Sequence, residues 1–187
     1  MQGSRRRQST APEIYVALLR AINVGGTGKL AMADLKAICR EAGFAQVETY
    51  IASGNVVFQA KMSAGEVKAA LEERLRRQVG KPIGVAIRSV DELAAIVEAN
   101  PFKTEPASKT VTIFLGEPPP RDALRNATGR QREELRLGKR EIFVHYPDGI
   151  GRSKLVLPAA RSGTARNMNT VARLAALAAK KRAAPDT

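Results

Sequence analysis

A polar loop between an apolar strand and a helix is the feature of this chain most suited to chemistry. Residues 20 to 26, Arg-Ala-Ile-Asn-Val-Gly-Gly, follow the apolar run Ile14–Leu19 and precede a predicted helix. Backbone N–H groups at a helix N-terminus, flexible glycines and nearby cations together form anion-binding sites. The candidate ligand-binding residues here are Arg20, Asn23, Gly25, Gly26 and Lys29. The loop is not a P-loop, because the GxxxxGK[ST] spacing is missing.

A second polar turn is expected beside this loop. Ser53-Gly54-Asn55 precedes the predicted strand Val56–Gln59. If that strand runs antiparallel beside Ile14–Leu19, the end of one lies next to the start of the other. Ser53 and Asn55 then join the candidate ligand-binding residues. In the alternative, Asn55 only satisfies a left-handed turn and Asn23 only braces its loop.

Gly149–Leu155 is a second candidate motif. Ser153 is predicted to cap a helix near 153–160, with Arg152 and Lys154 beside it. Acidic residues are usually favoured in a first helical turn, so cations at this place favour an external anion. The alternative is an ordinary capped helix whose charges face water.

Thr164–Thr170 is a third motif, predicted to open the last helix. Arg166 and Asn169 are candidates for bidentate binding of a phosphate or carboxylate. Asn167 is grouped with them as a candidate, although its simplest role is that of an N-cap.

Other catalytic or metal-binding arrangements are weak. His145 is the single histidine and lies in a predicted strand, which favours a structural residue over a general base. Cys39 shares helical spacing with apolar neighbours and is predicted to be buried and inert. CxxC, HxxxH and DxDxDG spacings are missing, as is GxGxxG, so neither a metal nor a cofactor is predicted.

The first half of the chain predicts a βαββαβ order, which is ferredoxin-like. Capping boxes at Ser63-x-x-Glu66 and Ser89-x-x-Glu92 mark two helix starts. In that fold the strand order is four-one-three-two, and the two central strands should be apolar on both faces. The predicted elements are strands at 14–19, 47–51, 56–59 and 84–88, with helices at 31–41 and from 63 to about 79.

The second half is predicted to be a smaller α+β lobe ending in helices. It is expected to cover the open face of the first sheet. The predicted elements are a helix from 89 to about 100, a strand at 110–115, a short helix after Pro118-Pro119-Pro120, a hairpin of 134–137 and 141–146, a helix near 153–160, and a last helix from 168 to 181. The expected divisions are a disordered basic tail at 1–12, lobes at 13–89 and 90–182, and a tail at 183–187.

The composition points to an anionic partner. The formal net charge is +13 with a pI near 10.5. The tail arginines and the basic C-terminus account for part of this charge and leave about +8 on the body. Simple solubility explains such a charge equally well. No apolar run reaches the roughly 20 residues that span a bilayer. The single cysteine fits a cytoplasmic protein.

Five segments carry a family resemblance. Leu18–Gly26, Tyr50–Phe58, Asn100–Phe102, Gly149–Leu155 and Thr164–Thr170 resemble the bacterial family called domain of unknown function 1697. The similarity extends from about Ile14 to Leu177. It implies a cytoplasmic α+β protein with a ferredoxin-like N-terminal lobe. It implies no activity, because the family has no established one.

Three positions depart from the pattern of that family. Ala21 replaces a usual Gly, Ala52 stands where Gln is frequent, and Met168 replaces a usual Trp. If the Trp stacks on a ligand, Met168 weakens that contact; if it only packs, Met168 can fill the space.

The sequence therefore favours a protein that binds a phosphorylated small molecule or nucleic acid at its polar loops. One alternative is an enzyme acting on a phosphorylated substrate, with Ser53 or Ser153 as nucleophile but no identified base. Another is a structural or partner-binding protein whose motifs only hold loops. The sequence predicts neither the ligand nor the oligomeric state.

Overall fold

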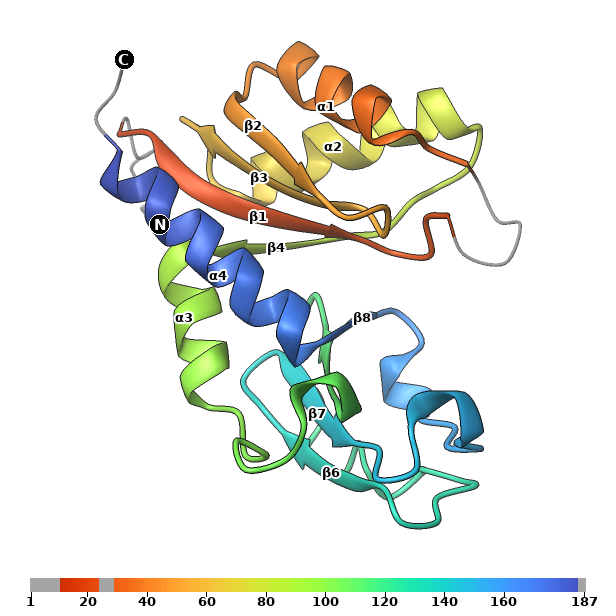
Figure 1. Cartoon of the computed structure of the whole chain (residues 1–187). Helices are drawn as coiled ribbons and strands as arrows, with labels where there is room; N and C mark the ends of the chain where they lie inside the picture. Colours follow the sequence, from red (N-terminus) through yellow and green to blue (C-terminus); the bar gives the residue numbers. More distant parts are fainter. Residues whose placement is uncertain (1–10, 24–28, 185–187) are drawn as a thin grey trace, which may run out of the picture.

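The computed structural model describes residues 11–23 and 29–184, which form two antiparallel four-stranded sheets and associated helices (Figure 1). The predicted α+β class is confirmed. The elements of the first half are β1 Glu13–Leu19, α1 Met32–Glu41, β2 Ala45–Tyr50, β3 Asn55–Ala60, α2 Ala64–Val79, β4 Val85–Ser89 and α3 Val90–Glu98. Those of the second half are β5 Thr110–Phe114, β6 Glu134–Leu137, β7 Glu141–His145, β8 Thr164–Asn167 and α4 Met168–Ala183.

The first sheet has the strand order β2-β3-β1-β4, which is the predicted order. Its central strands are β1 and β3, paired antiparallel from Glu13 with Ala60 to Leu18 with Asn55. Successive side chains of a strand point to opposite faces. Tyr15, Ala17 and Leu19 accordingly pack in the core under α1 and α2, whereas Ile14, Val16 and Leu18 pack in a second core on the other face.

Helices cover both faces of this sheet. Figure 1 shows α1 and α2 on one face and α3 with α4 on the other. Val171, Leu174 and Ala178 of α4 share a core with Ile14 and Val16 of β1. The last helix therefore returns to the first strand, and the expectation that the second half covers the open face is confirmed.

The helix starts follow the local sequence signals. Both predicted capping boxes form, with Ser63 and Glu66 at α2 and Ser89 and Glu92 at α3. Each serine accepts from the backbone N–H three residues on, and each glutamate accepts from the backbone of its serine. These reciprocal bonds satisfy N–H groups that a helix start leaves unpaired.

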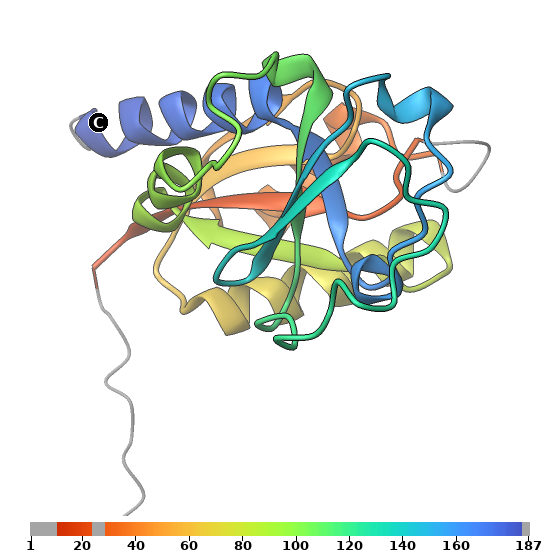
Figure 2. The same ribbon diagram turned by 90° about the horizontal axis from the view of Figure 1, so that it is seen from below.

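The second sheet has the order β6-β7-β5-β8. The predicted hairpin of β6 and β7 is confirmed, whereas no strand was predicted at 164–167, where β8 lies just before the last helix. β8 pairs with β5 and leads directly into α4. Figure 2 shows strands of the second sheet running across those of the first.

Two helices predicted in the second half are wrong. In place of the helix near 153–160 there are 3-10 turns at Ile150–Arg152 and Pro158–Ala160. Both backbone groups of Val156 pair with Thr128 instead of a helical neighbour. Pro158 also lacks the N–H that a helix interior needs. After the three prolines, residues 121–126 form turns and not a helix.

The lobe boundaries at 13–89 and 90–182 stay a prediction. The core under α3 and α4 includes Phe114 and Phe143 of the second sheet as well as β1 residues. No helix among residues 11–23 and 29–184 is both long and apolar enough to cross a membrane.

A buried ion pair joins the two sheets. Arg88 of β4 is 1% exposed and Glu141 of β7 is 3% exposed. The guanidinium Nε and Nη2 of Arg88 donate to Glu141 Oε1 at 3.0 and 2.8 Å. Nη2 also donates to the carbonyls of Leu115 and Arg140. The pair therefore ties the edge of the first sheet to the second.

Removing one partner of this pair should be strongly destabilising. We expect Glu141→Ala to lower the free energy of unfolding by about 3–5 kcal/mol, because Arg88 would keep a buried charge without a counter-charge. Glu98→Ala is the control, because Glu98 forms a solvent-exposed ion pair with Lys103. This change should lower the free energy of unfolding by less than about 1 kcal/mol. Urea denaturation of both variants is the measurement. Equal losses in the two variants would contradict the role given to Glu141.

Candidate functional site

The ends of β1 and β3 meet as the sequence predicts. Leu19 N donates to Gly54 O at 2.8 Å, so the loop after β1 lies beside the turn before β3. We call this place the β1 corner and define it by the residues Leu19–Asn23, Ala52–Asn55, Thr164 and Arg166. Arg20, Asn23, Ser53, Asn55 and Arg166 of the predicted site therefore come together here.

Gly54 makes the close approach possible. Its φ is +76°, and a Cβ at this position would lie 2.8 Å from Leu19 Cβ. A side chain would therefore be both conformationally strained and in steric conflict with β1. The turn and the end of β1 can pack together only through a glycine.

Asn23 braces the loop in which it stands. Its Nδ2 donates to Leu30 O at 2.9 Å and to Ala52 O at 2.8 Å, and its Oδ1 accepts from Leu30 N at 2.9 Å. Its φ of +58° is one that asparagine tolerates better than most residues. These contacts support the bracing alternative for Asn23.

Asn55 is fully buried and also has internal partners. Its Nδ2 donates to Tyr50 O and to Ser53 Oγ, both at 3.0 Å. Its Oδ1 accepts from Arg166 Nε at 2.6 Å. The amide therefore links the turn to β8.

Arg166 binds the β1 corner with all five of its N–H donors. Besides Asn55, Nη1 donates to Thr164 Oγ1 and Ala165 O, each at 2.8 Å. Nη2 donates to Leu19 O at 2.9 Å and Ser53 O at 2.8 Å. A ligand would have to displace one of these bonds, so we do not carry Arg166 forward as a ligand contact.

The charge of Arg166 has no counter-charge within the described part of the chain. The acceptors that Arg166 binds are carbonyls, an amide oxygen and a hydroxyl, and the residue is 9% exposed. Burial lowers the pKa of Arg166 to about 10. Since carbonyl dipoles only partly offset a buried charge, the β1 corner has a positive potential.

Arg20 is the exposed cation of the β1 corner. Its backbone N–H donates to Gly84 O at 2.9 Å. Its guanidinium has no ion pair or hydrogen bond with the residues that the structure describes. Arg20 and Thr164 both line a cleft between the two halves, so the free cation opens onto a cavity.

This central cleft has a volume of about 640 Å³. It lies between β4 and α2 on one side and the segment after β5 on the other. Apolar side chains and backbone form much of its wall, with polar groups from both halves. Its lining residues include Arg20, Lys68, Glu72, Phe114, Leu115, Glu117, Pro118, Pro119, Pro120, Asp122, Ala123 and Thr164.

The Gly149–Leu155 motif lies at a separate place. Ser153 does not cap a helix, so this part of the prediction is wrong. Its hydroxyl donates to Glu133, and its Oγ accepts from Leu155 N at 3.1 Å. Arg152 and Ser153 line a smaller pocket of about 250 Å³ with Glu133, and Lys154 is exposed.

The other predicted residues that the structure describes are not part of the β1 corner. Gly25 and Gly26 lie outside the described residues. Lys29 and Asn169 are exposed. Asn167 is the N-cap of α4, with its Oδ1 accepting from Thr170 N at 3.0 Å. Bidentate anion binding by Arg166 and Asn169 stays a prediction, but the N–H donors of Arg166 already bond inside the protein.

Met168 takes a packing role. It is 4% exposed within the core under α3 and α4, and its sulfur accepts from Thr112 Oγ1 at 3.0 Å. Among the alternatives for this position, packing is therefore the one that the geometry supports. Ala52, in contrast, is exposed on the turn.

Histidine and cysteine chemistry finds no support at these positions. His145 is a buried strand residue, and its Nδ1 has no hydrogen bond in the described structure. Cys39 is buried, and burial raises the pKa of its thiol to about 12, which suppresses the reactive thiolate. No group of three or more metal-ligating side chains occurs among residues 11–23 and 29–184.

Sequence reasoning missed the residues that set the two halves in place. Arg88 follows the apolar residues Val85–Ile87 within β4, and a charged residue in such a strand signals a buried partner. That signal was available but did not identify Glu141, which is 53 residues away. Lys68, Glu117 and Asp122 have no local pattern that marks them as cleft residues.

Comparison with known proteins supports the family resemblance. The model of the family described as protein of unknown function (DUF1697) matches residues 13–143. A conserved bacterial protein, SP0830 from Streptococcus pneumoniae, has a similar solved structure with a TM-score of 0.76 and 26% sequence identity. The similarity covers 90% of this chain and 99% of that one. A search of curated proteins gives no match.

Replacing Arg166 with lysine, which has fewer hydrogen-bond donors, should destabilise the fold. Lysine has three donors and no planar fork, so Arg166→Lys leaves carbonyls of the β1 corner unpaired. We expect a loss of about 3 kcal/mol or more in the free energy of unfolding. Arg173→Lys, an exposed change on α4, is the matched control and should be near neutral. Chemical denaturation that finds the two variants equally stable would refute this bracing role.

Ala21 offers a stabilising substitution. Its φ of +50° lies in the left-handed region, where alanine is strained. Ala21→Gly should raise the free energy of unfolding by about 1 kcal/mol and the melting temperature by roughly 2–4 °C. Ala37→Gly, in the exposed middle of α1, should do the opposite. A calorimetric scan in which Ala21→Gly melts below the parent protein would show that Ala21 is not strained.

Proposed function

The chain belongs to the DUF1697 family of proteins of unknown function, and we propose that it binds an anionic, phosphate-bearing small molecule in the central cleft. One observation carries the proposal. Exposed Arg20 lines the cleft and directly follows Leu19, whose carbonyl accepts from buried Arg166, and neither cation has a carboxylate partner in the described structure. An anion bound at Arg20 would supply the counter-charge that the β1 corner lacks.

The size of the cleft favours a small molecule over nucleic acid. Its volume of about 640 Å³ falls within the roughly 300–1,000 Å³ typical of small-molecule sites. Its wall combines apolar groups with a few polar ones, which is the usual composition of such sites. Nucleic acid recognition instead relies on many surface cations contacting phosphates, with strong salt dependence. Salt dependence therefore distinguishes these two partners.

Catalysis has weaker support than binding. Ser153 lies outside the central cleft, although its hydroxyl contacts Glu133. The hydrogen bonds from Ser153 and from the backbone of Gln131 lower the pKa of Glu133, which makes this carboxylate a poorer base. Ser53 Oγ accepts from Asn55 and has no general base among its described contacts. Neither serine has the activating partner that nucleophilic catalysis needs.

A loop-holding role explains Asn23, Asn55 and Arg166 but not Arg20. The first three use their polar atoms inside the protein. The guanidinium of Arg20 has no such use in the described structure, yet it lines the cleft. We therefore assign ligand contact to Arg20 and bracing to the other three. The cytoplasmic location expected from the single cysteine belongs to the same proposal.

Titration with defined anions tests this function. Isothermal calorimetry with inorganic phosphate and pyrophosphate should detect binding to the parent protein. Arg20→Gln should weaken it about 10- to 100-fold, because a charged hydrogen-bond donor is lost. Its melting temperature should stay within about 2 °C of the parent, since surface changes alter stability little. Arg173→Gln is the control and should bind like the parent.

Two results would overturn the proposal. One is the lack of any measurable phosphate or pyrophosphate binding by the parent protein. The other is equal binding by Arg20→Gln and Arg173→Gln. A labelled oligonucleotide that binds with a steep salt slope, unchanged by Arg20→Gln, would favour nucleic acid at another surface.

A further inference from the structure

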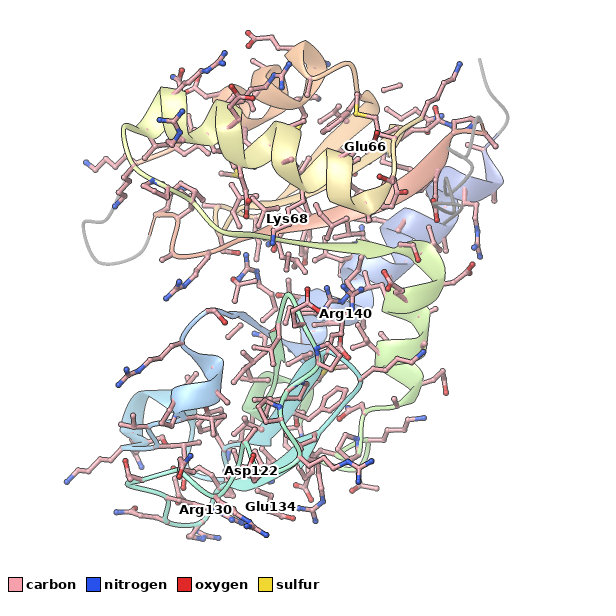
Figure 3. The ribbon with its side chains drawn as sticks, turned by 180° about the vertical axis from the view of Figure 1, so that it is seen from behind. Glu66, Lys68, Asp122, Arg130, Glu134 and Arg140 are labelled. Atoms are coloured by element: carbon pink, nitrogen blue, oxygen red, sulfur yellow. The ribbon has the colours of Figure 1, made fainter. Side chains whose placement is uncertain are left out.

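The two walls of the central cleft differ in charge. Arg20, Lys68 and Glu72 line it from the side of the first sheet, with one more cation than anion. Glu117 and Asp122 line the cleft from the segment that follows β5. Figure 3 shows Lys68 on α2 directed toward the second half, with Asp122 placed well within that half. The cleft is therefore polarised and not uniformly basic.

Lys68 lies where the two walls approach each other. A Cβ built on Gly116 would come within 3.9 Å of Lys68 Nζ, so the ammonium group reaches the segment that carries Glu117. Lys68 also lies 3.9 Å from Glu72 Oε1. At that separation the pair is loose, and Glu72 additionally accepts from Val85 N at 3.1 Å. A cation is thus held between the Arg20 end and the acidic wall.

Glu117 and Asp122 form the acidic wall of the cleft, and their side chains have no partner among the described residues. Within residues 11–23 and 29–184, neither Glu117 nor Asp122 forms a side-chain ion pair or hydrogen bond. Both side chains are exposed to the cleft and its solvent. Carboxylates of this kind accept hydrogen bonds from ammonium groups, which an anion-only ligand does not have.

The segment that carries Glu117 and Asp122 also lines the cleft with apolar groups. Phe114, Leu115 and Ala123 line it together with Pro118, Pro119 and Pro120. Prolines have no N–H donor and present rigid apolar rings. This stretch suits a methylene chain or a ring, whose contact area with water it would reduce. A ligand body between two charged groups therefore matches the cleft.

We propose that the central cleft takes a bipolar ligand, with a phosphate at Arg20 and Lys68 and an ammonium group at Glu117 or Asp122. This inference rests on the proposed function, because the phosphate end is the contact already assigned to Arg20. It adds the second group that a ligand of this protein carries. It also predicts that matching the separation of the two charges raises affinity.

Matched pairs of ligands test the inference. The probes are 2-aminoethyl and 6-aminohexyl phosphate, each compared with the alkyl phosphate of equal chain length by isothermal calorimetry. At least one amino phosphate should bind the parent protein about two- to fivefold more tightly than its partner, the range of an exposed ion pair. Glu117→Gln or Asp122→Asn should remove that preference and leave alkyl phosphate affinity unchanged or higher. Glu41→Gln, at the exposed end of α1, is the control and should retain the preference.

The possible outcomes distinguish a failure of the bipolar-ligand inference from a failure of the proposed anion binding. Equal binding of amino and alkyl phosphates by the parent protein overturns the bipolar ligand but leaves anion binding at Arg20 in place. A preference that survives in the combined Glu117→Gln and Asp122→Asn variant also overturns it. If neither kind of phosphate binds, both proposals fail. Arg20→Gln should weaken both kinds together, because the phosphate end is common to them.

Discussion

Two buried guanidinium groups hold the two sheets against each other. Arg88 extends from the first sheet to Glu141 of the second, and Arg166 extends from the second sheet to the β1 corner of the first. Removing a guanidinium from water costs several kcal/mol unless its donors and charge are matched. Separating the sheets would break both sets of bonds together. The position of every residue at their junction, including the central cleft, depends on these contacts.

The two arginines solve the same problem in different ways. Arg88 has a carboxylate partner, whereas the acceptors of Arg166 among the described residues are all neutral. A planar fork with five donors can join several carbonyls at once, which lysine cannot do. That geometry accounts for an arginine in β8, but it leaves an unmatched positive charge. The β1 corner is consequently held by many hydrogen bonds but keeps a positive charge that no described carboxylate balances. Arg20 adds a second cation at its surface.

The first half of the fold was predictable because its signals are local. The apolar run Ile14–Leu19, the capping box at Ser63 and the turn at Ser53-Gly54-Asn55 each act over a few residues, and they were sufficient for the order of the first sheet. β8 has only four residues, and its paired residues in β5 are 50 to 56 positions away. Ser153 resembled a cap, but its acceptor Glu133 lies 20 residues earlier. Contacts at such distances leave no trace in local spacing.

The same limit applies to the candidate site. Sequence spacing correctly joined the loop after β1 to the turn before β3, but it could not tell which polar residues would be used inside the protein. Asn23 and Arg166 are of the types that bind anions, but hydrogen bonds within the protein use their polar atoms and make them braces. Arg20 differs from them because its guanidinium forms no such bond with the described residues, and tertiary packing decides that difference. Since bracing places a buried charge next to an exposed one, the contacts that hold the loops also generate the positive potential that favours an anion there.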